Sequence, residues 1–206
     1  MKILAVSDEE ARNFYEYYTP GKLDGFDMII ACGDLHVQYL EFLVTMANCP
    51  LLYVHGNHDE GWRREPEGCV CIDDELYICK GLRILGLGGS YKYRDGKYMY
   101  SERQMRRRIA RLYWKIRRAG GVDILVTHAP AYGLNDLDTP AHRGFHCFLW
   151  LLENFSPRYF IHGHVHKNYG IHIPQRTQIG DTVVYNACGY VVFDYEKNSA
   201  EKTKKG

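Results

Sequence analysis

The sequence predicts an α/β protein in which two mixed β-sheets pack face to face, with helices outside each sheet. Two observations lead to this prediction. Short apolar runs alternate with segments of helical periodicity in the first third of the chain and again after residue 100, an order typical of sheets covered by helices. Between these regions, three short apolar runs are separated only by turns, which favours hairpins. The 206 residues are enough for one domain, expected over residues 1–195, with a charged tail over 196–206.

The first third of the chain is expected to form a β-α-β-α-β unit. Strands are predicted over residues 3–6, 28–31 and 51–54, because each is a short apolar run. The connecting segments, residues 10–18 and the stretch up to about residue 47, are predicted to be helices.

The rest of the chain contributes further strands and two more helices. Ser101 and Gln104 form a capping box, which predicts the start of a long helix. A last helix is predicted over residues 144–154. Further strands are predicted over residues 69–72, 76–79, 82–87, 123–126, 158–161, 182–187 and 191–195.

Polar side chains that can bind metal ions follow five of the predicted strands. Sites in open α/β sheets form just past the carboxyl ends of the strands, so these side chains are expected to meet at one rim. Carboxylates, imidazoles and one amide suit a pair of divalent first-row ions, a device used for in-line displacement at phosphorus. The side chains are those of Asp8, Glu10, Asp34, Asn57, His58, His128, His164 and His166.

The ordered set resembles the motifs of the calcineurin-like metallophosphoesterase family, which are D-x-H, G-D, G-N-H-D/E, H and G-H-x-H. The motifs cover nearly the whole chain, and their order is far more specific than any one of them. The resemblance implies a four-layer αββα sandwich and a metal-dependent phosphoesterase. The matching residues are Gly33, Asp34, Gly56, Asn57, His58, Asp59, His128, Gly163, His164 and His166.

The resemblance also implies a role for each metal ligand. Two divalent ions would be bound, with Asp34 as the bridging carboxylate between them. Asp8 and His166 would bind the first ion. The second ion would be bound by Asn57, His128 and His164.

The implied chemistry is in-line attack of a metal-bridging hydroxide on the phosphoester. His58 would contact the phosphate and protonate the leaving oxygen as general acid, which typically adds about 10²–10⁴-fold to the rate. Asp59 would orient His58, as carboxylates do for catalytic imidazoles. Catalysis is therefore assigned to His58, Asp59 and Asp34.

Position 10 departs from the family pattern, because Glu10 stands where D-x-H has His. Side chains two apart on an extended segment point the same way, so Glu10 is expected to face the first metal and to bind it. A third carboxylate would favour Mn²⁺, with iron, zinc, nickel and cobalt as the alternatives. It would also hold phosphate dianions less tightly, which favours phosphodiesters over monoesters. The alternative is that Glu10 does not bind and the chain is a catalytically silent metal-binding scaffold.

Two loops are candidates for substrate contact. The loop over residues 90–100 interleaves tyrosines with basic residues, and Ser90 and Arg94 are its candidates. The long loop after His128 contains His142 and Arg143, which are expected to grip the substrate. A small-molecule or nucleotide phosphoester is the favoured substrate, with a monoesterase or a nuclease as the rival enzyme.

Composition limits the partners and the compartment. The net charge of +1 predicts no nucleic-acid or membrane partner from the molecule as a whole, although residues 102–118 are rich in arginine. A solvated outer face is favoured for that helix over a nucleic-acid surface. The chain starts without a signal-peptide pattern, and the seven cysteines, Cys188 among them, are expected to be mainly buried thiols. A cytoplasmic protein is expected, and no oligomeric state is predicted.

Overall fold

The strands of the first sheet are apolar runs whose side chains alternate between two buried faces. The computed structural model describes residues 1–166 and 173–196. Every side chain of residues 3–7 and 28–31 is buried, as expected of strands covered on both sides. The parallel strands of this sheet are β1 (Lys2–Ser7), β2 (Met28–Ala31), β3 (Leu51–Tyr53) and β4 (Val70–Cys71), and β13 (Gly189–Asp194) runs antiparallel beside β1.

The second sheet is also mixed. Its antiparallel edge strands are β5 (Glu75–Cys79) and β11 (Arg176–Ile179). A short separate pair, β7 (Ser90–Tyr91) and β8 (Met99–Tyr100), follows β6 along the chain. The parallel strands of the second sheet are β6 (Leu82–Leu87), β9 (Ile124–Thr127), β10 (Tyr159–His162) and β12 (Thr182–Asn186).

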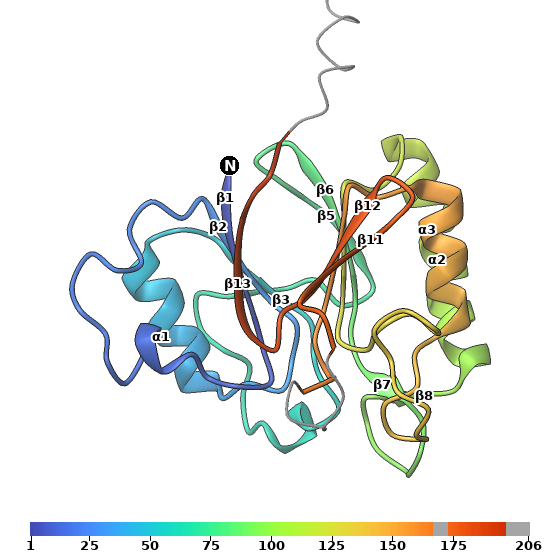
Figure 1. The fold of residues 1–206 in the computed structure, drawn as a ribbon, viewed down its shortest axis with the longest axis horizontal. Helices are drawn as coiled ribbons and strands as arrows, with labels where there is room; N and C mark the ends of the chain where they lie inside the picture. The colour runs from blue at the N-terminus through green and yellow to red at the C-terminus, as the bar shows by residue number, and fades with distance from the viewer. Residues whose placement is uncertain (167–172, 197–206) are drawn as a thin grey trace, which may run out of the picture.

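Three apolar clusters hold the layers together. Between the sheets, side chains such as Ile30 of the first sheet and Ile84 of the second belong to one buried cluster. The helix α1 (Val37–Ala47) covers the outer face of the first sheet, and α2 (Glu102–Ala119) and α3 (His146–Phe155) cover that of the second. Figure 1 shows the two sheets side by side with helices on either outside. The predicted αββα sandwich is therefore confirmed.

The long helix begins as predicted. Ser101 Oγ accepts a hydrogen bond from the Gln104 N–H at 3.3 Å, and Gln104 Oε1 accepts one from the Ser101 N–H at 2.8 Å. These contacts pair N–H groups that the first helical turn leaves without partners. The helix ends at Gly120, whose φ of +81° is the left-handed conformation that glycine adopts easily.

The helix predicted over residues 10–18 is wrong. Only a single 3₁₀ turn, η1 (Arg12–Phe14), forms there. Phe14 packs edge-on against Phe26 and Tyr190, with ring centroids 6.3 and 5.0 Å apart. Tertiary packing of one turn thus outweighs the weak helical pattern.

The prediction of hairpins for the three middle strands is only partly right. β5 and β6 form an antiparallel hairpin, but β4 pairs in parallel with β3 at the edge of the first sheet. The chain turns at Asp73 and Asp74, where Asp74 has a φ of +55°, and crosses from one sheet to the other. The corner separates β4 from the hairpin.

Two further expectations concern the membrane and the tail. Among residues 1–166 and 173–196, no helix is long and apolar enough to cross a bilayer. The charged tail expected over 196–206 lies outside the described residues except for Glu196.

Candidate metal centre

The carboxyl ends of strands from both sheets meet at one rim, at the lower end of the molecule in Figure 1. Asp8 and Asp34 follow β1 and β2 of the first sheet, and His128 and His164 follow β9 and β10 of the second. The His164 N–H donates to Asp8 Oδ2 at 2.8 Å, and Asp34 Oδ2 lies 3.3 Å from His128 Nε2. Side chains from distant parts of the sequence therefore form one cluster, as predicted.

Three of the clustered residues have a strained backbone. The φ angles of Asp8, Asp34 and His164 are +61°, +57° and +70°, in the left-handed region that L-residues rarely adopt. Such conformations cost of order 1–3 kcal/mol each and concentrate at functional sites. Each of these strands thus leaves its sheet through a sharp turn that carries a candidate ligand.

Glycines of the motifs allow the loops to approach one another closely. Gly33 has a φ of +91°, and a Cβ there would overlap the backbone of Gly56. A Cβ at Gly163 would overlap the Ser7 hydroxyl and the Asp8 carboxylate. The glycines are therefore needed for the ligand-bearing turns to touch.

One group of ligands, which we call the second position, consists of Asp34, Asn57, His128 and His164. Asp34, His128 and His164 each offer a ligand atom, and these atoms lie within 4.8 Å of one another. Asn57 Oδ1 is 3.1 Å from His128 Nε2. The set combines oxygen and imidazole nitrogen atoms, which suit a divalent first-row ion.

The two imidazoles of the second position have one nitrogen each bound to a backbone carbonyl. His128 Nδ1 donates to Cys32 O at 2.7 Å, and His164 Nε2 donates to Ala141 O at 2.6 Å. These hydrogen bonds fix the ring orientations and leave the opposite nitrogens for a metal.

The electrostatics of the cluster favour a bound cation. Burial opposes ionisation of Asp34, but the His128 charge and hydrogen bonds outweigh it and lower the pKa of Asp34 to about 2. Burial likewise opposes the charge of His128, yet Asp34 and Asp8 raise its pKa to about 10. The imidazolium of His128 thus supplies the positive charge that a metal would supply. Burial, helped by the His128 charge, lowers the pKa of His164 to about 3, so this imidazole is neutral, as a ligand must be.

Asp8 provides the clearest test of whether metals fit. Its side chain is only 1% exposed, and burial raises its pKa. Among the described residues, its Oδ1 is one of the few buried side-chain atoms without a hydrogen-bond partner. That oxygen lies 3.8 Å from His166 Nε2. A buried carboxylate oxygen without a partner is costly, and a divalent cation between Asp8 and His166 would satisfy it.

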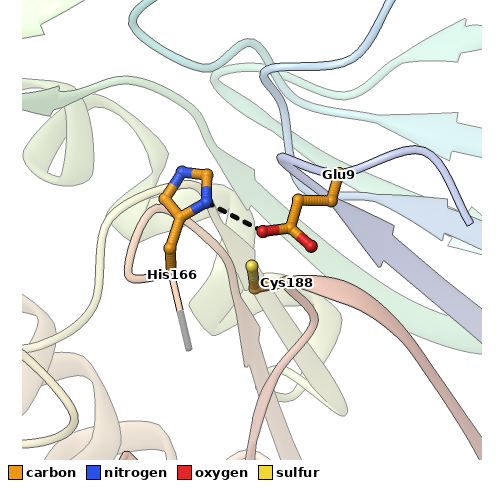
Figure 2. A group of neighbouring side chains, drawn as sticks. All are labelled: Glu9, His166 and Cys188. Carbon is orange, nitrogen blue, oxygen red and sulfur yellow. Dashed lines mark hydrogen bonds and ion pairs between the residues drawn. The ribbon is translucent and has the colours of Figure 1, made fainter. Parts of the chain in front are cut away.

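The structure places Glu9 beside His166 and takes Glu10 elsewhere. Glu10 Oε1 pairs with Nδ1 of the exposed His36 at 2.8 Å. Glu9 Oε1 lies 3.2 Å from His166 Nδ1 instead, and Figure 2 shows Cys188 next to both. The expectation for Glu10 assumed an extended segment, and the left-handed φ of Asp8 breaks the alternation on which it rested.

Glu9 and Cys188 are site candidates that the sequence patterns do not single out. The apolar neighbours of Cys188 predict only a buried thiol, and it lies near the opposite end of the chain from Glu9. Ser7 and Cys188 form an isolated parallel bridge, which brings them together in the fold. The one signal in the sequence was a second carboxylate after Asp8.

His58 and Asp59, the two residues assigned to acid catalysis, differ in their exposure and in their contacts. His58 is exposed, and its backbone N–H donates to Asp34 Oδ1 at 2.7 Å. Asp59 is buried, and its Oδ2 accepts from the N–H groups of Gly56 at 2.7 Å and Asp34 at 3.0 Å. Burial and the Asp34 charge raise the pKa of Asp59 to about 6. In this geometry, Asp59 holds two ligand-bearing loops together rather than contacting the His58 ring.

Of the four residues expected to contact substrate, His142 is the one beside a metal-ligand candidate. Its ring centroid lies 5.4 Å from that of His164. The Arg143 guanidinium lies over the rings of Tyr91 and Tyr132.

The other two candidates, on the tyrosine-rich loop, are committed to contacts within the protein. Arg94 pairs with Glu60 at 3.0 Å. Ser90 is fully buried and its hydroxyl donates to Tyr91 O, so the structure does not bring Ser90 to the rim.

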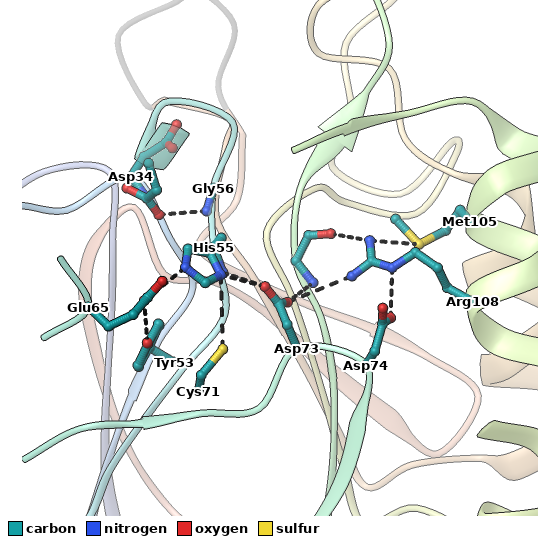
Figure 3. A network of polar contacts seen from close by, with 12 residues as sticks. Asp34, Tyr53, His55, Gly56, Glu65, Cys71, Asp73, Asp74, Met105 and Arg108 are labelled. Carbon is teal, nitrogen blue, oxygen red and sulfur yellow. Dashed lines mark hydrogen bonds and ion pairs between the residues drawn. The ribbon is translucent and has the colours of Figure 1, made fainter. Parts of the chain in front are cut away.

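A further polar network, which we call the His55 clip, connects the first sheet to α2. It consists of His55, Glu65, Asp73, Asp74 and Arg108 (Figure 3). His55 Nδ1 lies 2.6 Å from Asp73 Oδ2 and its Nε2 lies 3.1 Å from Glu65. The buried Arg108 donates to Asp74 at 2.7 Å. Burial opposes the charge of His55, but the hydrogen bond with Asp73 outweighs it and raises its pKa to about 11.

Comparisons with known proteins identify the fold and the family of this chain. A search of curated protein sequences finds no match. One solved structure superposes with a TM-score of 0.66 at 14% identity and covers 94% of both chains. TT1561 of Thermus thermophilus superposes with a TM-score of 0.63 at 17% identity, over 91% of this chain and 88% of that one. The family model described as calcineurin-like phosphoesterase matches residues 1–168. The chain therefore belongs to the calcineurin-like phosphoesterase family.

Proposed function

We propose that this protein hydrolyses a phosphoester with the help of two divalent metal ions, and that phosphodiesters are its preferred substrates. The observation that supports this most strongly is the buried cluster of carboxylates and imidazoles from both sheets, with an unsatisfied oxygen on Asp8. Asp34 is the candidate bridge, because it lies beside His128 of the second position and its charge also acts on Asp8. When bound, two such ions stabilise the charge of a phosphoryl group and lower the pKa of a water molecule.

The protein's own residues would bind the substrate and move a proton. His58 follows Asn57 and is exposed, so its ring can reach a phosphate at the rim. It is the candidate donor of a proton to the leaving oxygen. His142, beside His164, is the candidate for orienting the ester group.

The charge of the site supports the preference for diesters. Two dications carry four positive charges, and Asp8, Asp34, a glutamate and a bridging hydroxide would neutralise all four. A site without net charge would hold phosphate dianions less tightly than a more positive site, which favours singly charged diesters over dianionic monoesters. This count is unchanged when Glu9 takes the place expected for Glu10. Carboxylates around the first ion, beside Asp8 and His166, would favour Mn²⁺, provided that no softer ligand joins them.

The proposal can be tested with two chromogenic esters. The protein is loaded with Mn²⁺, Zn²⁺ or Co²⁺ and assayed on bis-(p-nitrophenyl) phosphate and on p-nitrophenyl phosphate. We expect faster turnover of the diester and a loss of about 10²-fold or more in kcat/KM for Asp34→Asn, because the bridging charge is removed. Asp27→Asn, the same change at an exposed carboxylate that pairs with Lys80, is the matched control.

Each outcome has a definite meaning. Hydrolysis that survives Asp34→Asn would refute the assigned centre. Metal binding without hydrolysis of either ester would identify a silent scaffold. Faster turnover of the monoester would refute the preference for diesters.

A further inference from the structure

We propose that Glu9 and Cys188 join Asp8 and His166 as ligands of the first metal ion, so that this ion is bound by a thiolate. This inference rests on the proposed function, since it concerns the same metal centre. It replaces Glu10 with Glu9 and adds a sulfur ligand that the sequence patterns do not indicate. We call this group of four residues the first position.

The side chains of the first position are already close together. Glu9, His166 and Cys188 each offer a ligand atom, and these atoms lie within 4.8 Å of one another. Tetrahedral ligands of one zinc ion, at about 2.0–2.3 Å from the metal, lie about 3.3–3.8 Å apart, so these atoms would approach one another by up to about 1.5 Å on binding. Figure 2 shows the Cys188 sulfur pointing toward the carboxylate of Glu9.

A second and independent observation also indicates a cation here. Asp8 Oδ1, on a side chain that is 1% exposed, has no hydrogen-bond partner and lies 3.8 Å from His166 Nε2. The Glu9 carboxylate approaches the other nitrogen of the same ring at 3.2 Å. An imidazole binds one ion through one nitrogen, so both carboxylates reach the same ion only when the His166 ring or one of them turns. Their combined negative charge is what a divalent ion would neutralise.

The fold explains why Cys188 is next to Asp8. Cys188 forms a parallel bridge with Ser7, the last residue of β1, and Asp8 follows at once. A cavity of about 730 Å³, lined by Glu9 and Cys188 among others, opens beside this point and gives an ion a path to the site. Although Cys188 is 1% exposed, it is therefore one of the residues at the edge of a solvent-connected cavity.

Cys188 must bind as a thiolate. Coordination to a divalent ion makes the thiol acidic enough to release its proton to water. Thiolate ligands favour Zn²⁺ or Co²⁺ over Mn²⁺, whereas the oxygen and imidazole ligands of the second position do not exclude Mn²⁺. The two positions should thus prefer different metals. The Mn²⁺ preference expected from carboxylates alone would then apply to the second position only.

Cobalt absorption tests the sulfur bond directly. The chelator-stripped protein is given two equivalents of Co²⁺, and its near-ultraviolet spectrum is recorded for the thiolate-to-cobalt charge-transfer band. We expect the band in the wild type and in Cys71→Ser, and its loss in Cys188→Ser and Cys188→Ala. Cys71→Ser is the matched control, because Cys71 lies near His55 and Asp73 in a similar group.

The outcomes separate this inference from the proposed function. Two bound cobalt ions without a charge-transfer band, or a band that is lost in Cys71→Ser instead, would overturn the inference and leave the phosphoesterase proposal standing. Failure to bind any cobalt would overturn both. Circular dichroism spectra that match the wild type establish that the Cys188 variants are folded.

Measurements of metal binding show whether Glu9 or Glu10 is the carboxylate ligand of the first ion. Glu9→Gln should weaken binding of the first ion by about 10-fold or more, as measured by equilibrium dialysis, and Glu10→Gln should not change it. The reverse result would assign the carboxylate ligand to Glu10 and overturn this part of the inference.

Discussion

The first position and the group around His55 contain the same kinds of residue, and they differ in how their charge is balanced within the protein. Glu9, His166 and Cys188 of the first position correspond in kind to Asp73 and His55 of the His55 clip together with the neighbouring Cys71. Each combines an imidazole, a thiol and a carboxylate within ligand distance. Residue type alone would assign a metal to both.

In the His55 clip, the nitrogens of His55 and the oxygens of Asp73 have hydrogen-bond or ion-pair partners within the protein. Both nitrogens of His55 are paired, one with Asp73 and one with Glu65. Asp73 Oδ1 also accepts from the Gly88 N–H at 2.6 Å. Burial opposes the charge of His55, but the hydrogen bond with Asp73 raises its pKa to about 11, and two carboxylates balance that charge. Such a network supports the fold, because every buried charge in it is neutralised by a neighbour.

In the first position, the negative charge exceeds what the protein supplies to balance it. Asp8 keeps an oxygen without a partner, and Glu9 and Asp8 approach one imidazole from two sides. Residue type therefore does not distinguish a structural network from a metal site. The excess negative charge and the unsatisfied oxygen of Asp8 do. Four substitutions should distinguish the two groups, and their effects are expected to decrease in the order given below.

Asp73→Ala should lower the free energy of unfolding by about 3–5 kcal/mol, because it removes the carboxylate that pairs with the buried charge of His55 and lies near that of Arg108. The loss should be the same with and without added metal, as measured by urea denaturation in Zn²⁺ and in EDTA. Asp95→Ala, at a side chain 95% exposed, should change it by less than about 1 kcal/mol. A loss that depends on metal would show that the clip is itself a metal site.

Asp8→Asn should change the stability of the metal-bound protein and not lower that of the metal-free protein. The metal-free protein should unfold at the same or a slightly higher urea concentration, because a buried carboxylate with a raised pKa is replaced by a neutral amide. The stabilisation that wild type gains from metal, about 2.7 kcal/mol for a site at a hundred times its Kd, should be reduced. An unchanged metal increment would exclude Asp8 as a ligand.

Gly163→Ala should cost about 1–3 kcal/mol, because the new Cβ would overlap Ser7 and Asp8. The variant should also bind the first metal more weakly, since Asp8 must move. Thermal denaturation and metal titration give the two effects. Gly61→Ala, where a Cβ would meet no atom within 4 Å, is the control and should leave metal binding unchanged.

Glu10→His should have the smallest effect. Glu10 pairs with His36, whose side chain is 83% exposed, so the change in stability should stay below about 1 kcal/mol. Metal preference and the pH profile of activity should also stay as in the wild type, because Glu9 is the carboxylate at the first position. A shift of the activity optimum to lower pH would show that Glu10, and not Glu9, is the carboxylate ligand of the first ion.

The second position could be predicted from the sequence because each of its ligands lies within four residues of the end of a strand. A parallel sheet places the carboxyl ends of its strands at one edge, so Asp34, Asn57, His128 and His164 are brought together by the order of elements alone. The αββα layers followed from the same order of elements, and the capping box at Ser101 fixed the start of α2.

The first position could not be predicted in full, for two physical reasons. The left-handed backbone at Asp8 exchanges the directions of Glu9 and Glu10, and no period in the sequence reports that angle. Cys188 reaches the site through pairing of its strand region with β1, a contact between the two ends of the chain. The helix wrongly expected over residues 10–18 has a similar cause, since contacts of Phe14 with distant rings decide its conformation.

Anomalous scattering from crystals grown with Co²⁺ would locate the ions themselves and so decide between the two groups. We expect two peaks about 3.5–4 Å apart. Asp34 should lie between them, one peak should be adjacent to Asp8 and Cys188, and no peak should lie at His55. A single peak, or a peak between His55, Cys71 and Asp73, would show that the metal centre has been assigned wrongly.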